Sequence, residues 1–146
     1  MKDKTIDYVL RTTWLCVNKM YNEEAAKFES TMATGFTLLS IDPEKGTPST
    51  ALGPKMGMEA TSLSRILKTM EKRGLIERHP NPEDGRGVLI HLTEFGKEKR
   101  ALSKQKVLTF NDAIREHISV EKLNHFYEVA ETINEMVSNK KIYKNT

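Results

Sequence analysis

One stretch of the chain, residues 58–73, constrains the fold more than any other. Its apolar residues recur at steps of three and four positions, which places them along one side of an α-helix. This apolar stripe comprises Ala60, Leu63, Ile66, Leu67 and Met70. Gly74 follows the stretch and predicts the end of the helix. The sequence therefore predicts an amphipathic helix whose apolar side is buried.

A second side of this helix carries hydroxyl and cationic side chains. Its members are Thr61, Arg65, Lys68 and Lys72, with Ser62 and Ser64 flanking them near the helix start. Arginine and lysine bind phosphates and guanine edges, and serine and threonine bind either kind of group. We therefore predict that this side of the helix contacts a groove of DNA.

The neighbouring segments extend this helix into a larger motif. A short helix is predicted over residues 49–56, and Gly57 provides the turn between the two helices. Residues 76–79 and 88–92 are strand candidates, and the run between them, 81–87, is dense in turn-forming residues. A hairpin that follows a helix-turn-helix forms a winged helix, so the sequence predicts a wing over residues 80–88.

The predicted wing carries an arginine, Arg86, two positions after Asp84. A carboxylate at this spacing can hold the guanidinium by a charge-assisted hydrogen bond and aim it. The alternative is that both are solvated turn residues, because surface ion pairs contribute little on average.

Amphipathic helices are also predicted on both sides of this central motif. They cover residues 5–28, 32–41, 94–117 and a last helix after Ser119. The expected N-caps are Thr31 or Ser30, Thr93 and Ser119, and for the helix over 49–56 either Thr47 with Pro48 at the first helical position, or Ser49.

Several short motifs occur in a fixed order through the centre of the chain. They are Gly57-Met58, Thr61-Ser62-Leu63-Ser64-Arg65, Leu67, Met70-Glu71-Lys72-Arg73-Gly74-Leu75-Ile76-Glu77-Arg78, Asp84-Gly85-Arg86 and Leu92-Thr93-Glu94-Phe95-Gly96. Each is weak alone, but their combination is specific. In this order they resemble the MarR family of bacterial transcription regulators.

The resemblance implies a mostly α-helical winged helix-turn-helix fold, with about six helices and a two- or three-stranded β-wing. It implies one MarR-like domain over 1–146, with a DNA-binding lobe at about 32–93 and dimerisation helices at about 1–30 and 94–146. Two recognition helices held about 34–36 Å apart can enter successive major grooves, which explains why a homodimer is expected. The alternative is that the terminal helices complete a monomeric core.

The expected function is therefore a homodimeric, ligand-responsive repressor that binds a near-palindromic site on double-stranded DNA. The expected DNA-binding residues are Ser49, Thr50, Thr61, Ser62, Ser64, Arg65, Lys68 and Arg86, with Asp84 supporting the wing. Arg86 is expected in the minor groove, because narrow A·T-rich grooves attract arginine. Five basic residues between 97 and 106 either begin near the DNA or form a solvated helix face.

By the same resemblance, a small aromatic or phenolic effector is expected to bind between the dimerisation helices and the winged-helix lobe. The expected lining residues are Trp14, Tyr21, Met32 and Phe36. The alternative is that these side chains only pack in the core, as aromatic residues and methionines at helical spacing usually do.

Composition limits the other classes of function. The chain has 146 residues, 38% hydrophobic and 29% charged residues and a net charge of +3, which fits a soluble single domain and permits nucleic-acid binding. We expect a cytoplasmic protein without a signal peptide or membrane span. The four histidines show no metal-ligand spacing, and no catalytic motif occurs, so we expect neither enzymatic activity nor a cofactor or metal.

Two alternatives to a ligand-responsive repressor remain. A winged helix can bind a partner protein instead of DNA, in which case the exposed side of residues 61–72 should be apolar or aromatic. The single cysteine, Cys16, can make the protein a thiol redox-sensing regulator, although a helical cysteine is usually a small buried hydrophobe.

Overall fold

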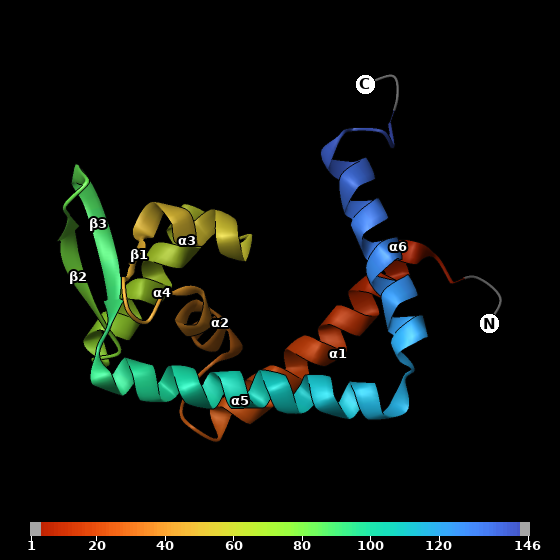
Figure 1. Ribbon diagram of the computed structural model, residues 1–146, viewed down its shortest axis with the longest axis horizontal. Coiled ribbons are helices and arrows are strands. Elements are labelled where there is room, and N and C mark those ends of the chain that lie inside the picture. Colours follow the sequence, from red (N-terminus) through yellow and green to blue (C-terminus); the bar gives the residue numbers. More distant parts are fainter. Residues whose placement is uncertain (1–3, 144–146) are drawn as a thin grey trace. The chain divides into compact units, whose positions relative to one another are not determined.

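The computed structural model describes residues 4–143, apart from the side chain of Arg86. Within these residues it has six helices and one three-stranded antiparallel sheet (Figure 1). The helices are α1 (Ile6–Ala26), α2 (Met32–Ser40), α3 (Ser49–Met56), α4 (Ala60–Lys72), α5 (Glu94–His117) and α6 (Val120–Ser138). The strands are β1 (Thr47–Pro48), β2 (Ile76–Asn81) and β3 (Asp84–Leu92). The predicted fold class is confirmed.

The chain divides into two compact units, Met1–Gln105 and Lys106–Thr146. The first holds the elements from α1 to β3 and the first half of α5. The second holds the rest of α5 and all of α6. None of the described helices combines the length and the hydropathy that crossing a bilayer requires.

The core of the first unit lies between α2, α3, α4 and the sheet. Its buried apolar residues are Leu38, Ile41, Leu52, Leu63, Leu67, Met70, Leu75, Ile76, Ile90 and Leu92. Most of the apolar stripe predicted for residues 58–73 points into this core, and Ile66 packs against it half-buried. The placement of Ala60 in the stripe was wrong, because Ala60 is exposed. It is the first residue of α4, one turn before Leu63, where the helix reaches the core.

The strands are longer and the turn is shorter than predicted. β2 pairs with β3 from Ile76↔Leu92 to Asn81↔Asp84, which leaves only Pro82 and Glu83 in the turn. The side-chain oxygen of Asn81 accepts a hydrogen bond from the backbone N–H of Glu83 at 3.0 Å, and this closes the turn locally. The residues that follow are therefore free to pair, and the prediction of a turn extending to Gly87 was wrong.

Three of the predicted N-caps are confirmed. The side-chain oxygens of Thr31, Thr93 and Ser119 each accept a backbone N–H three residues on, at 2.9–3.2 Å. The cap predicted for α3 was wrong. Pro48 occupies the N-cap position without a side-chain hydrogen bond, and Thr47 pairs with β3. The Thr47 hydroxyl instead accepts the backbone N–H of Asp42 at 2.8 Å and closes the loop between α2 and β1.

The two helices of the helix-turn-helix end in the same way. Gly57 and Gly74 have positive φ angles of 63° and 75°, and each follows a helix. The backbone N–H of the next residue, Met58 or Leu75, donates to a carbonyl five residues back, at 2.9 Å in both cases. This is a Schellman motif, in which an apolar residue after the glycine packs back onto the helix. The predicted turn at Gly57 and helix stop at Gly74 are confirmed.

The end of α4, the base of the sheet and the start of α5 meet at one junction. The Thr93 hydroxyl donates to the Gly74 carbonyl at 2.5 Å and accepts the Gly96 N–H at 2.9 Å. The Thr93 N–H donates to the Leu75 carbonyl at 3.1 Å. Gly96 packs so closely on that carbonyl that a Cβ atom has no room there. This contact explains physically why a threonine and a glycine stand three residues apart at the start of α5.

We predict that Gly96→Ala destabilises the protein, because the added methyl group would overlap the Leu75 carbonyl. Overpacking of this kind costs about 1–3 kcal/mol or more. Urea denaturation followed by circular dichroism measures the loss. Gly85→Ala is the matched control, because a Cβ at Gly85 meets nothing within 4 Å. Equal stability of the two variants would contradict the close contact at the junction.

Candidate nucleic-acid interface

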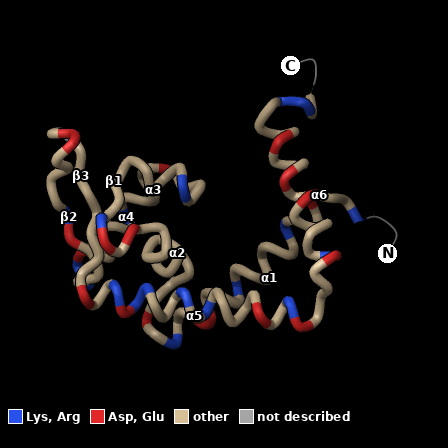
Figure 2. The backbone as a smooth tube through the Cα atoms, viewed as in Figure 1, with Lys and Arg blue, Asp and Glu red and all other residues tan. Residues whose placement is uncertain are grey.

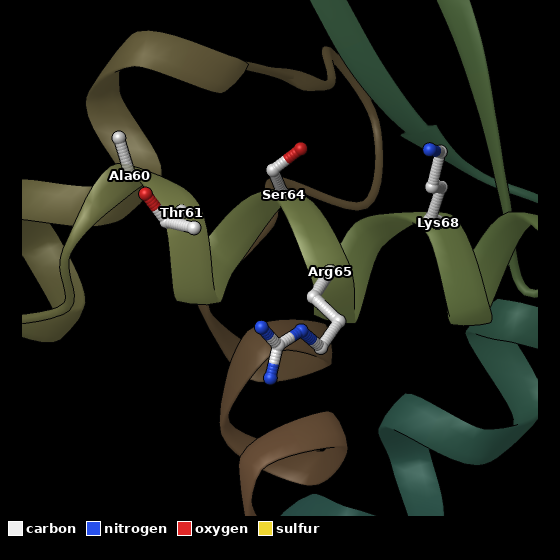
Figure 3. Close-up of a pocket in the computed structure, with 5 residues that line it drawn as sticks. All are labelled: Ala60, Thr61, Ser64, Arg65 and Lys68. Atoms are coloured by element: carbon white, nitrogen blue, oxygen red, sulfur yellow. The ribbon is translucent and has the colours of Figure 1, made fainter.

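The outward side of α4 is exposed and carries hydroxyl and cationic side chains. Leu63, Leu67 and Met70 point into the core, so the opposite side of the helix faces solvent. A shallow open pocket on this side is lined by Ala60, Thr61, Ser64, Arg65 and Lys68 (Figure 3). We call this set the α4 surface. In the close-up, Arg65 points away from Ser64 and Lys68, so the polar groups span a broad part of the helix circumference.

The structure thus brings together four of the five residues predicted to lie on this helix at the DNA. Ser62 is exposed but does not line the pocket. At 100° per residue it lies on the other flank of the helix, beside Thr69. Ala60 lines the pocket, although its apolar side chain led us to predict that it was buried. Its position at the helix start was the only sequence signal for its exposure.

The hydroxyl groups at the start of α4 are available for hydrogen bonds to a ligand. Among the described residues, Thr61, Ser62 and Ser64 have no hydrogen-bond partner for their side chains. Thr69, on the same helix, instead donates to the Arg65 carbonyl at 3.2 Å. The three hydroxyls near the helix start can therefore donate to or accept from a ligand without breaking an existing bond.

The cations of the α4 surface are also unpaired. Arg65 and Lys68 are exposed and form no ion pair with any residue from 4 to 143. Basic residues at the start of α5 differ, as Lys97 pairs with Glu94 at 3.3 Å and Lys99 lies 5.4 Å from the centre of the Phe95 ring. Figure 2 shows acidic as well as basic residues along α5, among them Glu94 and Glu98 at its start. The start of α5 is thus a mixed-charge surface, whereas the α4 surface presents cations alone.

An ion pair joins the end of α4 to the first strand of the wing. The Arg78 Nε donates to the Glu71 Oε2 at 3.0 Å, across the turn at Gly74. The sequence does not predict this pair, because the pair depends on the direction in which β2 leaves α4. Acidic and basic residues on either side of a glycine turn were the only signal.

The predicted anchors on α3 lie at its N-terminus. Ser49 is half-buried and Thr50 is exposed, and they are the first two residues of the helix. Neither lines the pocket on α4. Backbone N–H groups at a helix N-terminus favour an anion, so this end of α3 has the polarity that a phosphate requires.

The wing residues Asp84 and Arg86 both belong to β3. The Asp84 Oδ2 lies 3.3 Å from the position that a Cβ atom on Gly87 would occupy, so the carboxylate packs along the strand. The side chain of Arg86 lies outside the described part of the structure. The predicted support of Arg86 by Asp84 stays a prediction.

Two of the four residues predicted to line an effector pocket lie together. The rings of Tyr21 and Phe36 meet edge to face with their centroids 5.6 Å apart, and burial raises the pKa of Tyr21. Met32 begins α2, and its N–H donates to the Asn22 Oδ1 at 3.0 Å. Trp14 is 50% exposed and makes no ring contact with another described residue. The structure therefore pairs Tyr21 with Phe36 but not with Trp14.

The alternative role of Cys16 in redox sensing stays a prediction. Cys16 is a free, exposed thiol on α1. Among the described residues, no group of three or more histidine, cysteine, aspartate or glutamate side chains is placed to hold a metal ion.

Comparison with known families identifies the central motif. Residues 31–88, which contain the helix-turn-helix and most of the wing, match the model of the MarR family. The central part of the chain is therefore similar to the MarR family. The chain is 33% identical over 92 residues to the organic hydroperoxide resistance transcriptional regulator of Bacillus subtilis. The aligned region covers 63% of this chain and 60% of that relative. Matches to this and other curated relatives span between 25% and 65% of their lengths.

Solved MarR-family structures share the fold. A mutant of MarR from E. coli complexed with operator DNA superposes with a TM-score of 0.78 at 21% identity, over 88% of this chain and 92% of that one. PcaV from Streptomyces coelicolor, in complex with its natural ligand, superposes with a TM-score of 0.78 at 16% identity, over 94% and 99% of the two chains. These similarities show that the chain has the MarR winged-helix fold.

We predict that the Glu71–Arg78 pair stabilises this winged-helix lobe only weakly. Both side chains are more than one third exposed, so the coupling should be about 0.2–1 kcal/mol and should fall with added salt. A double-mutant cycle with Glu71→Gln and Arg78→Gln, measured by urea denaturation at low and high salt, tests this. A cycle on Glu94 and Lys97 is the control for an exposed pair within one helix. A coupling that does not change with salt would contradict the prediction.

Proposed function

We propose that this protein is a sequence-specific DNA-binding transcription regulator, and that it acts as a ligand-responsive, homodimeric repressor. The observation that carries the proposal is the α4 surface. It is exposed, and its hydroxyl and cationic groups have no partners among the described residues. A protein-interaction surface would be expected to be apolar or aromatic at this place. The alternative of an interaction module is therefore less well supported.

The comparisons support the DNA-binding part of the proposal. A MarR protein with this fold has been seen complexed with operator DNA, and residues 31–88 of this chain match the same family. The match contains α3, α4, β2 and the turn of the wing. These are the elements that a winged helix uses to contact the groove and the DNA backbone.

In the proposed complex, different parts of the lobe contact different parts of the duplex. The N-terminal half of α4 enters the major groove, where Arg65 donates to a guanine and Lys68 binds a phosphate. Ser49 and Thr50 hold the DNA backbone at the start of α3. Arg86 reaches the minor groove from the wing. Two copies of this arrangement require a near-palindromic site.

The homodimer is supported by apolar side chains on both terminal helices. The large exposed hydrophobic residues of α1 and α6 include Ile6, Val9, Leu10, Trp14, Leu15, Val120, Phe126, Tyr127, Val129 and Val137. Large exposed apolar side chains on a helix are typical of an interaction site. A second copy of the chain is the partner we propose.

Regulation by a small aromatic or phenolic effector is supported by a related structure. PcaV has this fold and is known in complex with its natural ligand. The edge-to-face pair of Tyr21 and Phe36, which joins α1 to α2, is where we propose that the effector binds. An effector there would move α1 relative to α2 and thereby change the spacing of the two α4 helices in the dimer.

We predict that Arg65→Ala and Lys68→Ala weaken DNA binding in different ways. Arg65→Ala should cost about 1–3 kcal/mol on the specific site and little on random DNA, because it removes a base contact. Lys68→Ala should weaken binding to both DNAs and lower the slope of log K against log salt by about 1, because it removes a phosphate contact. Fluorescence anisotropy with the DNA upstream of the gene, at several salt concentrations and with random DNA as competitor, measures both.

The control for these variants is Lys19→Ala, because Lys19 is an exposed lysine on α1 that pairs with Glu23. Its affinity for both DNAs should match that of the unaltered protein. Equal losses on specific and random DNA for Arg65→Ala would contradict base recognition by Arg65. Absence of any preference for the upstream DNA would favour the interaction-module hypothesis.

We predict that Phe126→Glu converts the dimer into a monomer, because a charge would replace a phenyl ring that is 58% exposed on α6. Affinity for the full site should then fall about 100-fold or more, because the second half-site no longer binds as part of the same molecule. Light scattering coupled to gel filtration measures the mass. Asn124→Glu places the same charge on the polar side of α6 and should remain dimeric. A monomeric unaltered protein would overturn the homodimer.

A further inference from the structure

We infer that the first turn of α4 recognises a thymine through the side-chain methyl group of Thr61. This inference rests on the proposed function, since it assigns one contact within the proposed α4–DNA interface. It adds a base preference that hydrogen bonding and charge do not provide. Three features of the α4 surface lead to this inference. They are the position of Thr61 on the helix, the absence of a hydrogen-bond partner for its hydroxyl among the described residues, and the alanine that precedes it.

Thr61 is placed where a recognition helix meets the bases. It is the second residue of α4, and N-terminal residues of such helices contact base edges in the major groove. At 100° per residue it lies almost opposite the buried Leu63 and Met70, and so near the middle of the outward side of the helix. Arg65 and Lys68 follow one and two turns later. Thr61 is therefore placed to approach the base edges closely, since its short side chain lies near the middle of the outward side.

The Thr61 side chain is not held by its own helix. A helical threonine commonly donates to the carbonyl three or four residues back, as Thr69 does to Arg65 and Thr37 does to Ala33. For Thr61 these positions are Gly57 and Met58, which precede the helix, and no described residue bonds its hydroxyl. Rotation about χ1 can thus turn either the methyl or the hydroxyl towards a base.

The surroundings of Thr61 favour a methyl contact. Ala60 lines the same pocket, so the first turn of α4 carries one alanine and one threonine methyl group, whereas the cations come later in the helix (Figure 3). Thymine is the base that presents a methyl group in the major groove, and alanine and threonine methyl groups are the side-chain groups that pack on it. The first turn of α4 therefore fits a thymine, and Arg65 fits a neighbouring guanine.

The test uses DNA from which single methyl groups are removed. Purified protein first selects its preferred site from a randomised duplex pool, and each thymine of that site is then replaced in turn by deoxyuridine, which lacks only the methyl group. At one thymine in each half-site, the unaltered protein should lose about three- to fivefold in affinity, the value of one buried methyl group. Fluorescence anisotropy at fixed salt measures the change.

Two substitutions separate the methyl group from the hydroxyl. Thr61→Ser keeps the hydroxyl and removes the methyl, so it should bind thymine and deoxyuridine sites equally, both at the lower affinity. Thr61→Val keeps a methyl group and should still prefer thymine by three- to fivefold. Thr69→Ser is the matched control, because Thr69 lies on the same helix outside the pocket, and it should behave like the unaltered protein. Thermal denaturation checks that all three variants fold.

The outcomes distinguish this inference from the proposed function. Selection of a defined site together with a Thr61→Ser protein that still prefers thymine over deoxyuridine would overturn the methyl contact and leave the DNA-binding function intact. A lack of any effect of deoxyuridine on the unaltered protein would do the same. A protein that enriches no sequence from the pool would overturn both the proposed function and the inference.

Discussion

The packing of Gly96 against the Leu75 carbonyl holds the winged-helix lobe together. At this point α4 has just ended, β2 is about to begin, β3 has just returned and α5 starts. The Thr93 hydroxyl joins the Gly74 carbonyl to the Gly96 amide, so two chain segments about 20 residues apart share one set of hydrogen bonds. Because Leu75 and Ile76 are buried beside it, the junction also closes the core. The direction of α4 relative to the wing follows from this contact.

The orientation of α4 in turn determines which groups the lobe exposes. With its C-terminal end fixed at the junction and Leu63 and Leu67 buried, the helix cannot rotate about its axis without exposing core residues. Burial of each such side chain stabilises the fold by about 1.5–3 kcal/mol. Rearranging exposed polar groups would stabilise it by less. The hydroxyl and cationic groups therefore face solvent as a consequence of packing. Glycines 57 and 74 permit this arrangement because both helices must end in a left-handed residue.

Periodicity in the sequence was enough to predict the inward side of α4, the ends of most helices and the helix-turn-helix, because these depend on local spacing and on single capping residues. Three features were out of its reach. The exposure of Ala60 depends on where along its axis the helix meets the core. The Glu71–Arg78 pair depends on the course of β2 after the turn. The length of the wing strands depends on Asn81 closing a turn that the sequence alone could place anywhere from 81 to 87.

Partners within the protein, rather than the number of basic residues, distinguish the candidate interface. The net charge of +3 is too small to identify a nucleic-acid surface, and basic residues are numerous on α5 as well. There, Lys97 and Lys99 already interact with Glu94 and Phe95. On α4, Arg65 and Lys68 are exposed and unpaired among the described residues, so binding a phosphate or a base would break no existing ion pair. Packing holds α4 in place, and the polar groups of the α4 surface have no partners among the described residues. Such a surface can bind a polyanion without breaking existing interactions.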